Sequence, residues 1–334
     1  MKRLIYTILV VFIIALIPSL LYWSCIRLNL RSVKKLSALE YALHQSNRHD
    51  IVFVGSSRVI RHVNPFIIDS VTGLDSYVLG VNGMGIVESN MLMNVYLRSH
   101  PKPRIMVINT DYNIFFTDGP LFNITDYYPY LDDTLVYSYL SPYKSEYSNS
   151  IVRSWMIFLR LIGTTDYERG LALMPDLTRT WYPPNTNKKS YKGFLPVDHL
   201  WTRASNSPTT QKQKVIAREM GFTILKEMVA TCKQKDILPV FLYTTQHQKA
   251  DSIFTNQKDI MNRVKHIADS LQVPFLNYED LYIRSGEKYF IRYSMFNKTS
   301  DFFNYSHLNS LGANVLSKYI AADLNKYIHS TNTP

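Results

Sequence analysis

The sequence predicts an α/β protein, a three-layer α/β/α sandwich around a five-stranded parallel sheet, preceded by one transmembrane helix. From about residue 50 onward, short apolar runs alternate with longer amphipathic stretches. This alternation is typical of parallel strands that are covered by helices on both faces. Ahead of that region, residues 4–23 form an apolar run without a charged side chain, which predicts the membrane helix.

The apolar run is long enough to cross a bilayer. A helix rises 1.5 Å per residue, and the hydrocarbon core is about 30 Å thick. Lys2 and Arg3 precede the run and Tyr22 and Trp23 end it, which are the flanks expected of a spanning helix. A cleaved signal peptide would have an apolar core of about 7 to 15 residues and a small-x-small cleavage site, and no such site follows here. We therefore expect residues 1–25 to be an uncleaved signal anchor.

The charges around the anchor leave its orientation open at this stage. More basic residues follow the span than precede it, which by a simple count would place the large domain inside the cell. Long domains, however, translocate largely regardless of such charges. The basic residues that follow the span are Arg27, Arg31, Lys34 and Lys35. They lie in a juxtamembrane segment, residues 26–48, in which we expect a helix over Ser32–Gln45.

The overall charge does not indicate nucleic-acid binding. The formal net charge is +11, but residues 1–35 hold six basic side chains and no acidic one. The remainder is an ordinary mixed surface without a basic stripe of interleaved aromatics, so we expect no nucleic-acid partner. With two cysteines, nine histidines and no CxxC or HExxH motif, the chain is expected to hold no metal and no cofactor.

The predicted strands are short and rich in Val, Ile, Leu, Phe or Tyr, whereas the predicted helices are longer and amphipathic. The strands are expected at Ile51–Gly55, Ser76–Gly80, Arg104–Asn109, Leu238–Thr244 and Val273–Asn277. The helices are expected at Asn64–Val71, Ile86–Arg98, Gln213–Lys233, Gln257–Leu271 and Ser310–Leu324. Together they define an α/β domain over residues 49–330.

A long insertion interrupts this domain at about residues 115–213. The stretch is rich in Tyr, Trp, Pro and Asn, as in TWYPPNTNKKSYKGF. A long irregular insertion in a compact domain is usually functional or disordered, and this one is too aromatic for a plain linker. It is expected to form a cap or substrate platform, or alternatively a shielding decoration. A helix-like piece at Ile151–Ile162 is expected to form its core or to dock on the membrane.

Two polar segments are candidates for a reactive site. The first predicted strand runs directly into Gly55-Ser56-Ser57-Arg58, and ligands of open parallel sheets bind at the carboxyl ends of strands. Near the other end of the chain, a polar loop over 301–313 delivers His307 just ahead of the last helix. In a doubly wound sheet, that loop can bring the histidine over the end of the first strand. Taken singly, a GSS turn and a lone histidine are more often structural.

Three sequence blocks together resemble the SGNH (GDSL-type) hydrolase superfamily. They are GSS after the first strand, LGVNGMG over 79–85 after the second, and N-x-x-H-L-N-x-x-G-A before the last helix. The chain is most similar to membrane-anchored, extracytoplasmic members related to the D-alanyl-transfer protein of teichoic acid and to polysaccharide O-acetyltransferases. The resemblance covers about residues 50–325 without the insertion. It implies a flavodoxin-like sheet and serine-based acyl transfer without a cofactor.

The resemblance implies a role for individual residues. Ser57 matches the nucleophile of the GDS motif, Ser56 takes the place of its Asp, and His307 matches the general base. Gly80 matches the glycine whose backbone N–H helps to form the oxyanion hole. The third block, which normally supplies an Asn side chain after the third strand, offers Asn109, Asp111 and Asn113 here, and the last two are our oxyanion-hole candidates. Candidate substrate-binding residues are Asn82 and Arg58, and a surface salt bridge is an equally weighted alternative for Arg58.

One position departs from the family pattern. The acid that orients the base normally lies three residues before the histidine, where this chain has Asn304. An amide can orient an imidazole but cannot stabilise an imidazolium as a carboxylate does, and in serine proteases such a change lowers turnover about 10⁴-fold. Asp301 is a second candidate for the acid. The sequence is also compatible with a Ser–His dyad, with a triad in which Asn304 assists as in papain-like enzymes, or with a domain that binds without catalysing.

The expected function is that of an esterase or O-acyltransferase that acts on a cell-envelope glycan through an acyl-enzyme at Ser57. The alternative is a catalytically weak scaffold or carbohydrate-binding component of an envelope-polymer modification or export complex. A nucleotide-binding domain is disfavoured because no GxGxxG or GxxxxGK[ST] follows a predicted strand. Expected partners are the membrane through residues 4–23, the envelope glycan or acyl donor, and a membrane acyltransferase. By the resemblance, the large domain is expected outside the cytoplasmic membrane, in the periplasm.

Overall fold

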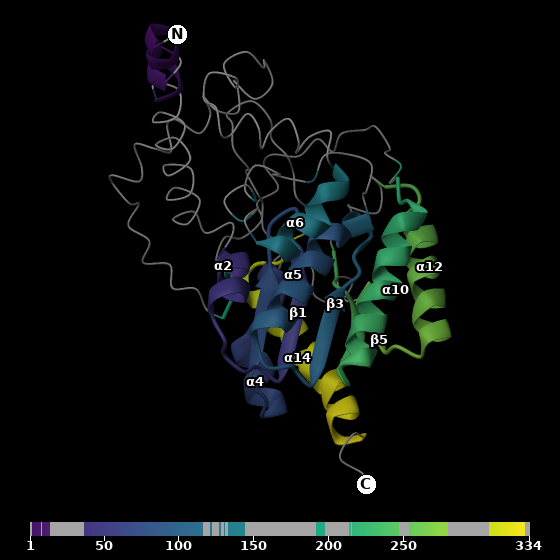
Figure 1. Cartoon of the computed structure of the whole chain (residues 1–334). Helices are drawn as coiled ribbons and strands as arrows, with labels where there is room; N and C mark the ends of the chain where they lie inside the picture. Colours follow the sequence, from purple (N-terminus) through teal and green to yellow (C-terminus); the bar gives the residue numbers. More distant parts are fainter. Residues whose placement is uncertain are drawn as a thin grey trace, which may run out of the picture. The chain divides into compact units, whose positions relative to one another are not determined.

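The computed structural model contains a five-stranded parallel sheet with helices packed on both faces (Figure 1). The structure describes residues 2–7, 9–13, 37–115, 121, 127, 130, 133–143, 192–197, 214, 216–246, 254–279 and 307–330. The strands are β1 (Ile51–Gly55), β2 (Ser76–Gly80), β3 (Ile105–Asn109), β4 (Leu238–Tyr243) and β5 (Phe275–Asn277). The predicted parallel sheet is thereby confirmed, with β1 and β2 at the expected bounds and the others shortened at an end.

The order of the strands determines where a ligand can bind. The sheet runs β2-β1-β3-β4-β5, and every neighbouring pair is parallel. The chain leaves β1 toward one edge of the sheet and returns after β2 to place β3 on the other side of β1. In a doubly wound sheet such a reversal opens a crevice at the carboxyl ends of the two central strands, here β1 and β3.

The helices largely confirm the predicted ones, with two short helices, α3 and α6, missed. The described helices are α2 (Ser37–His44), α3 (Ser57–His62), α4 (Pro65–Thr72), α5 (Ile86–Ser99), α6 (Thr134–Leu140), α10 (Glu219–Gln234), α12 (Gln257–Leu271) and α14 (Ser310–Ser330). α12 has the predicted bounds, α10 begins later than expected, and α14 continues to Ser330. α3 was not predicted, because its six residues start immediately after the glycine-serine turn.

One face of the sheet carries the largest apolar cluster. Alternate residues of the strands, such as Phe53, Val78 and Val107, are fully buried against α3, α4 and α14. α4 and α14 contribute Ile68 and Leu316 to the same cluster. Full burial of such a side chain contributes about 1.5–3 kcal/mol, so this layer fixes α3 and α14 firmly on the sheet. α5 and α10 pack against each other and contact β1 and β4, respectively.

A short segment, Lys192–Val197, closes the β2 edge of the sheet. The Val78 N–H donates to the Lys192 carbonyl (2.9 Å), and the Leu195 N–H donates to the Ile60 carbonyl in α3 (2.7 Å). The Lys192 ammonium pairs with Asp69 (2.5 Å) and also with Asp75. The segment thus covers part of the β2 edge, and covering an edge strand limits its pairing with other chains.

The chain divides into two compact units, Met1–Glu40 with Asn123–Lys189, and Tyr41–Phe122 with Ser190–Pro334. The second unit contains the sheet. Residues 2–7 and 9–13 are helical, and the rest of the predicted anchor lies outside the described residues. Among the described residues, no helix is both long enough and apolar enough to cross a membrane. Most of the predicted 115–213 insertion, including Ile151–Ile162, also lies outside them.

A glycine substitution tests how tightly the Lys192–Val197 segment packs on β2. Gly193 has φ +82°, and a Cβ there would stand 1.8 Å from the Val78 carbonyl oxygen. Gly73 has φ +71° with open space around it, so it is a matched control for the backbone conformation alone. Gly73→Ala should cost about 1 kcal/mol of unfolding free energy. Gly193→Ala should cost at least about 2 kcal/mol more, because the backbone must shift.

Denaturant unfolding of the two variants measures this difference. Equal losses for Gly193→Ala and Gly73→Ala would show that the Lys192–Val197 segment is not packed on β2 as described.

Candidate active site

The turn after β1 places Ser57 just beyond the carboxyl end of the strand. Gly55 ends the strand, and a Cβ at this position would lie 2.3 Å from the Asn109 Cβ and 2.7 Å from the Val59 side chain. Only a glycine therefore lets β3 and α3 approach the strand end so closely. Ser56 is the N-cap of α3 in extended conformation, and Ser57 is the first residue of the helix. Ser57 is partly exposed, while Ser56 and Arg58 are buried.

His307 meets Ser57 from the far end of the chain. The His307 Nε2 lies 2.8 Å from the Ser57 Oγ, although the two residues are 250 positions apart in the sequence. His307 is 4% exposed and stands just before α14. The Asn309 side chain accepts the Gly312 N–H (3.0 Å) and so caps the start of that helix. The structure thus brings the predicted nucleophile and base within hydrogen-bond reach, as proton transfer between them requires.

The surroundings of His307 favour its neutral form. Burial lowers the pKa of the imidazole well below its ordinary value of 6.5, and the positive charges of Arg61 and Arg58 lower it further. A neutral imidazole can accept the proton of a serine hydroxyl, whereas an imidazolium cannot. At neutral pH His307 is therefore in the form that a general base needs.

A buried polar network holds both flanks of Ser57. Before it, the Ser56 hydroxyl donates to the Asn109 side-chain oxygen (3.3 Å), and the Asn109 amide donates to Asp111 (2.8 Å). After it, the Arg58 guanidinium lies 3.5 Å from the Asp111 carboxylate and donates to Gln246 (2.6 Å). The nucleophile is thus fixed from β3 and from the segment after β4.

The ion pair in this network is fully enclosed. Arg58 is 1% exposed and Asp111 is 0% exposed. Burial acts to lower the pKa of Arg58, but Asp111 and Tyr112 raise it above the ordinary arginine value, so the guanidinium keeps its charge. Burial raises the pKa of Asp111, against the opposing effects of Arg58 and the hydrogen bonds from Asn109 and Thr244.

Two predicted roles are corrected by this geometry. Arg58 was expected to bind substrate, but its guanidinium is enclosed and engaged by Asp111 and Gln246. Asp111 was expected in the oxyanion hole, but its carboxylate accepts from Asn109, from the Thr244 N–H (2.9 Å) and from the Thr244 hydroxyl. A carboxylate offers no proton to an oxyanion. Both residues instead position the turn that carries Ser57.

The other oxyanion candidates lie in different settings. Gly80 is paired with Gly55 in the parallel register, and a Cβ at Gly80 would lie 2.5 Å from the Gly55 carbonyl oxygen. This places Gly80 beside the nucleophile's turn, and its role in the oxyanion hole stays a prediction. Asn109 donates its amide to Asp111 and to the Leu242 carbonyl (3.4 Å). Asn113, in the 3-10 helix Tyr112–Phe115, also stays a prediction.

The remaining candidates are only partly tested. Asn304 and Asp301 lie outside the described residues, so the structure does not choose between the triad and the dyad. Asn82 is partly exposed in the turn after β2, as a substrate contact requires, and has no described contact with Ser57 or His307. Within the described part of the chain, no three His, Cys, Asp or Glu side chains gather to hold a metal ion.

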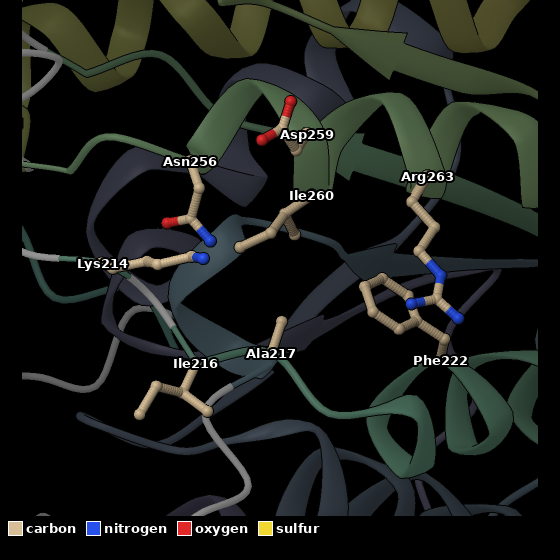
Figure 2. A pocket seen from close by; sticks show the side chains of 8 residues that line it. All are labelled: Lys214, Ile216, Ala217, Phe222, Asn256, Asp259, Ile260 and Arg263. Atoms are coloured by element: carbon tan, nitrogen blue, oxygen red, sulfur yellow. The ribbon is translucent and has the colours of Figure 1, made fainter.

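A cavity elsewhere in the same unit does not contain the Ser–His pair. Figure 2 shows side chains of α10, α12 and the preceding segment around it. Arg263 forms an ion pair with Glu219, and its guanidinium lies 4.0 Å from the centre of the Phe222 ring. Its charge is therefore already engaged. The cavity is lined by Lys214, Ile216, Ala217, Phe222, Asn256, Asp259, Ile260 and Arg263.

Sequence reasoning missed the network's long-range members. Gln246 follows β4, and its amide donates to Gln257 at the start of α12 (2.9 Å). His62 ends α3 and accepts the Leu308 N–H at its Nε2 (3.0 Å). The available signal was the cluster of polar residues directly after predicted strands, Gln246 after β4 among them. No signal in the sequence connects His62 to the loop of His307.

The chain has only distant similarity to known proteins. No family model and no curated protein matches the sequence. One similar solved structure, from Desulfitobacterium hafniense, is provisionally described as a lipolytic protein of the G-D-S-L family; it has TM-score 0.40 and 8% identity, over 82% of this chain and 99% of that one. Another, from Bacteroides fragilis, is provisionally described as an acylhydrolase, with TM-score 0.41 and 13% identity, over 88% and 96% of the chains. The proposals below rest on the site itself.

Removing the charge of Asp111 should be far more costly than removing a surface charge. Asp111→Asn leaves the Arg58 cation buried without its counter-ion, and breaking such a pair costs about 3–5 kcal/mol of unfolding free energy. Lys102→Ala is the control: Lys102 pairs with Asp236 at 3.2 Å, but the two side chains are 59% and 87% exposed. An exposed pair contributes at most about 1 kcal/mol.

Denaturant unfolding of Asp111→Asn, Lys102→Ala and the double variant Arg58→Met/Asp111→Asn gives the comparison. The double variant should be more stable than Asp111→Asn, because it leaves no uncompensated charge. If Asp111→Asn proves no more costly than Lys102→Ala, the enclosed ion pair does not exist in solution.

Proposed function

We propose that this chain is a serine acyl-transfer enzyme, an esterase or O-acyltransferase that acts on a cell-envelope glycan. The observation that carries the proposal is the 2.8 Å contact between the Ser57 Oγ and the His307 Nε2 at the carboxyl end of β1. Ligands of open parallel sheets bind at that end, and a serine hydroxyl beside a neutral imidazole is the arrangement that activates a weak nucleophile. The strand order is also the one that the SGNH resemblance implies.

The reaction follows from the roles of the two side chains. The Ser57 Oγ attacks the acyl carbon of the donor ester while the His307 Nε2 takes its proton. The bond to the leaving oxygen then breaks, and the imidazolium returns that proton to the leaving group. A water or sugar hydroxyl next attacks the acyl-Ser57 ester, gives its proton to His307, and releases Ser57 with its hydroxyl restored. Water as the acceptor makes an esterase, and a sugar hydroxyl makes a transferase.

The charges near the site support chemistry through an oxyanion. Arg61 and Arg58 lie close enough to His307 to act on it electrostatically. Positive charges at this distance also favour the negative charge that develops on the acyl oxygen in the transition state. The same charges disfavour the imidazolium intermediate, which an acid in place of Asn304 would have stabilised. We therefore expect slower turnover than in an enzyme with a complete triad.

The anchor and the location belong to the same proposal. The uncharged run over 4–23 supports attachment to the cytoplasmic membrane. A membrane acyltransferase is the proposed source of the acyl donor, and the aromatic insertion is the proposed platform for the glycan. We place the large domain on the extracytoplasmic side, where envelope polymers are modified. Protection of that domain from added protease in intact spheroplasts would overturn this placement.

A fluorophosphonate probe tests the nucleophile. Wild-type protein should become covalently labelled on Ser57, because the probe needs a serine that a neighbouring base activates. Ser57→Ala should abolish labelling, and His307→Ala should slow it at least about 100-fold, the lower range for loss of a general base. Ser56→Ala is the matched control. Ser56 is the neighbouring serine, but it is buried and its hydroxyl donates to the Asn109 side-chain oxygen (3.3 Å) rather than to His307.

Peptide mass spectrometry locates the label. Folded wild-type protein that takes up no probe would instead favour the scaffold or carbohydrate-binding alternative that Asn304 suggests.

The pH dependence of ester hydrolysis tests the state of His307. The base works only when neutral, so kcat/KM falls as the pH drops through its pKa in the free enzyme. Because burial, Arg61 and Arg58 lower the pKa of His307 below 6.5, activity should persist below pH 6.5 and be half-lost only at more acidic pH. Removing one positive charge in Arg61→Gln should move the midpoint upward. A wild-type midpoint at or above 6.5 would contradict the account.

A further inference from the structure

The loop that carries His307 is held by the same helix that carries Ser57. α3 begins with Ser57 and ends with His62. The His62 Nε2 accepts the backbone N–H of Leu308, the residue that follows the base, over 3.0 Å. The ring of His62 also meets the ring of His307 edge to face, with centroids 5.9 Å apart and planes at 84°. The short helix α3 thus carries Ser57 at one end and contacts His307 and its loop through His62 at the other.

The hydrogen bond from the Leu308 N–H determines which nitrogen of His62 carries the proton. A backbone N–H can donate only to an imidazole nitrogen that has no proton, so Nε2 must be unprotonated and the ring carries its proton on Nδ1. His62 is 0% exposed, so no solvent competes for the Leu308 amide. A buried hydrogen bond of this kind fixes the backbone of the loop at the residue next to the base.

A second backbone contact fixes the same loop two residues after Leu308. The Ser310 N–H donates to the Val197 carbonyl (2.9 Å), and the Lys192–Val197 segment is itself tied to α3 through the Ile60 carbonyl. Both attachments follow His307 in the chain, at Leu308 and Ser310, and both lead to elements that also position Ser57. Because Asn304 stands where the family pattern has an acid, the attachment of the loop gains weight in orienting the base.

We infer that His62 is a positioning residue that holds His307 at Ser57 through the Leu308 amide. This inference rests on the proposed acyl transfer at Ser57. The expected consequence is on turnover, since a displacement of about 1 Å between reacting groups can cost about 100-fold in rate. KM should change little, because His62 is buried and offers nothing to a substrate.

Two amide substitutions separate this role from packing. In His62→Gln the side-chain oxygen can reach the place of the Nε2, whereas in His62→Asn it reaches only the place of the Nδ1. With p-nitrophenyl acetate and the full chain in detergent micelles, His62→Asn should lower kcat about 10- to 100-fold with KM unchanged. His62→Gln should keep at least about a third of wild-type kcat. Equal kcat in His62→Asn and wild type would overturn the inference.

The tautomer of His62 can be measured by NMR independently of activity. In the wild-type chain with 15N-labelled histidine, the long-range 1H–15N spectrum at pH 7 should show His62 as the Nδ1–H tautomer, assigned by its absence in His62→Gln. An Nε2–H or doubly protonated ring would overturn the inference, even if His62→Asn fails to fold. A wild-type chain that hydrolyses no ester but shows the Nδ1–H tautomer would count against the proposed function and leave the contact standing.

A purely structural role gives a different pattern. In that case His62→Asn would lower the melting temperature while the folded fraction kept the wild-type kcat, and the inference would be wrong.

Discussion

The hydrogen bond between the Ser57 Oγ and the His307 Nε2 is the interaction on which the account of this protein depends. It joins two segments 250 residues apart, so it depends on the elements that position each of them. The fold makes the meeting possible, because α3 follows β1 directly and α14, which follows His307, packs against α3 and α4. The apolar layer of α3, α4 and α14 then fixes the distance between the nucleophile's helix and the loop of the base.

Polar contacts add to the apolar layer in fixing the positions of Ser57 and His307. Arg58, Asp111 and Asn109 hold the turn around Ser57, and their burial makes each contact costly to break. His62 and the Val197 carbonyl hold the loop around His307. Burial, helped by the positive charges of Arg61 and Arg58, lowers the pKa of His307 and so keeps the imidazole neutral. This geometry supports the proposed acyl transfer, and the chain has an amide at 304 where the family pattern has an acid to support the imidazolium.

The sequence predicted the parts of the fold that local patterns determine. β1 and β2 were predicted at their observed bounds because strands buried on both faces consist almost entirely of Val, Ile, Leu, Phe and Tyr. α12 was predicted fully because its apolar residues recur at helical spacing. α3 was missed because a six-residue helix that starts with Ser-Arg and contains Val and Ile has little helical preference of its own. Its contacts with the sheet and α14 stabilise it instead.

Sequence reasoning predicted that Ser57 and His307 would meet, as they do in the structure, and it was less accurate for the residues around them. Ser57 and His307 follow from motif order and strand context, whereas Arg58 was misassigned because an arginine after a reactive serine looks exposed until its partner is known. Asp111 becomes that partner only through the neighbouring positions of β1 and β3. His62 was missed for the same reason, since its acceptor role depends on the approach of a loop from the far end of the chain.

The most direct test of the central claim is to trap the acyl-enzyme. Full-length protein mixed with an activated acetyl ester and quenched in acid should carry one acetyl group on the peptide that contains Ser57, with a burst of released alcohol equal to the enzyme concentration. His307→Ala should form this species far more slowly, and Ser57→Ala should not form it. Turnover of the ester without an acetylated Ser57 peptide, or acetylation at the same rate in His307→Ala, would contradict the account.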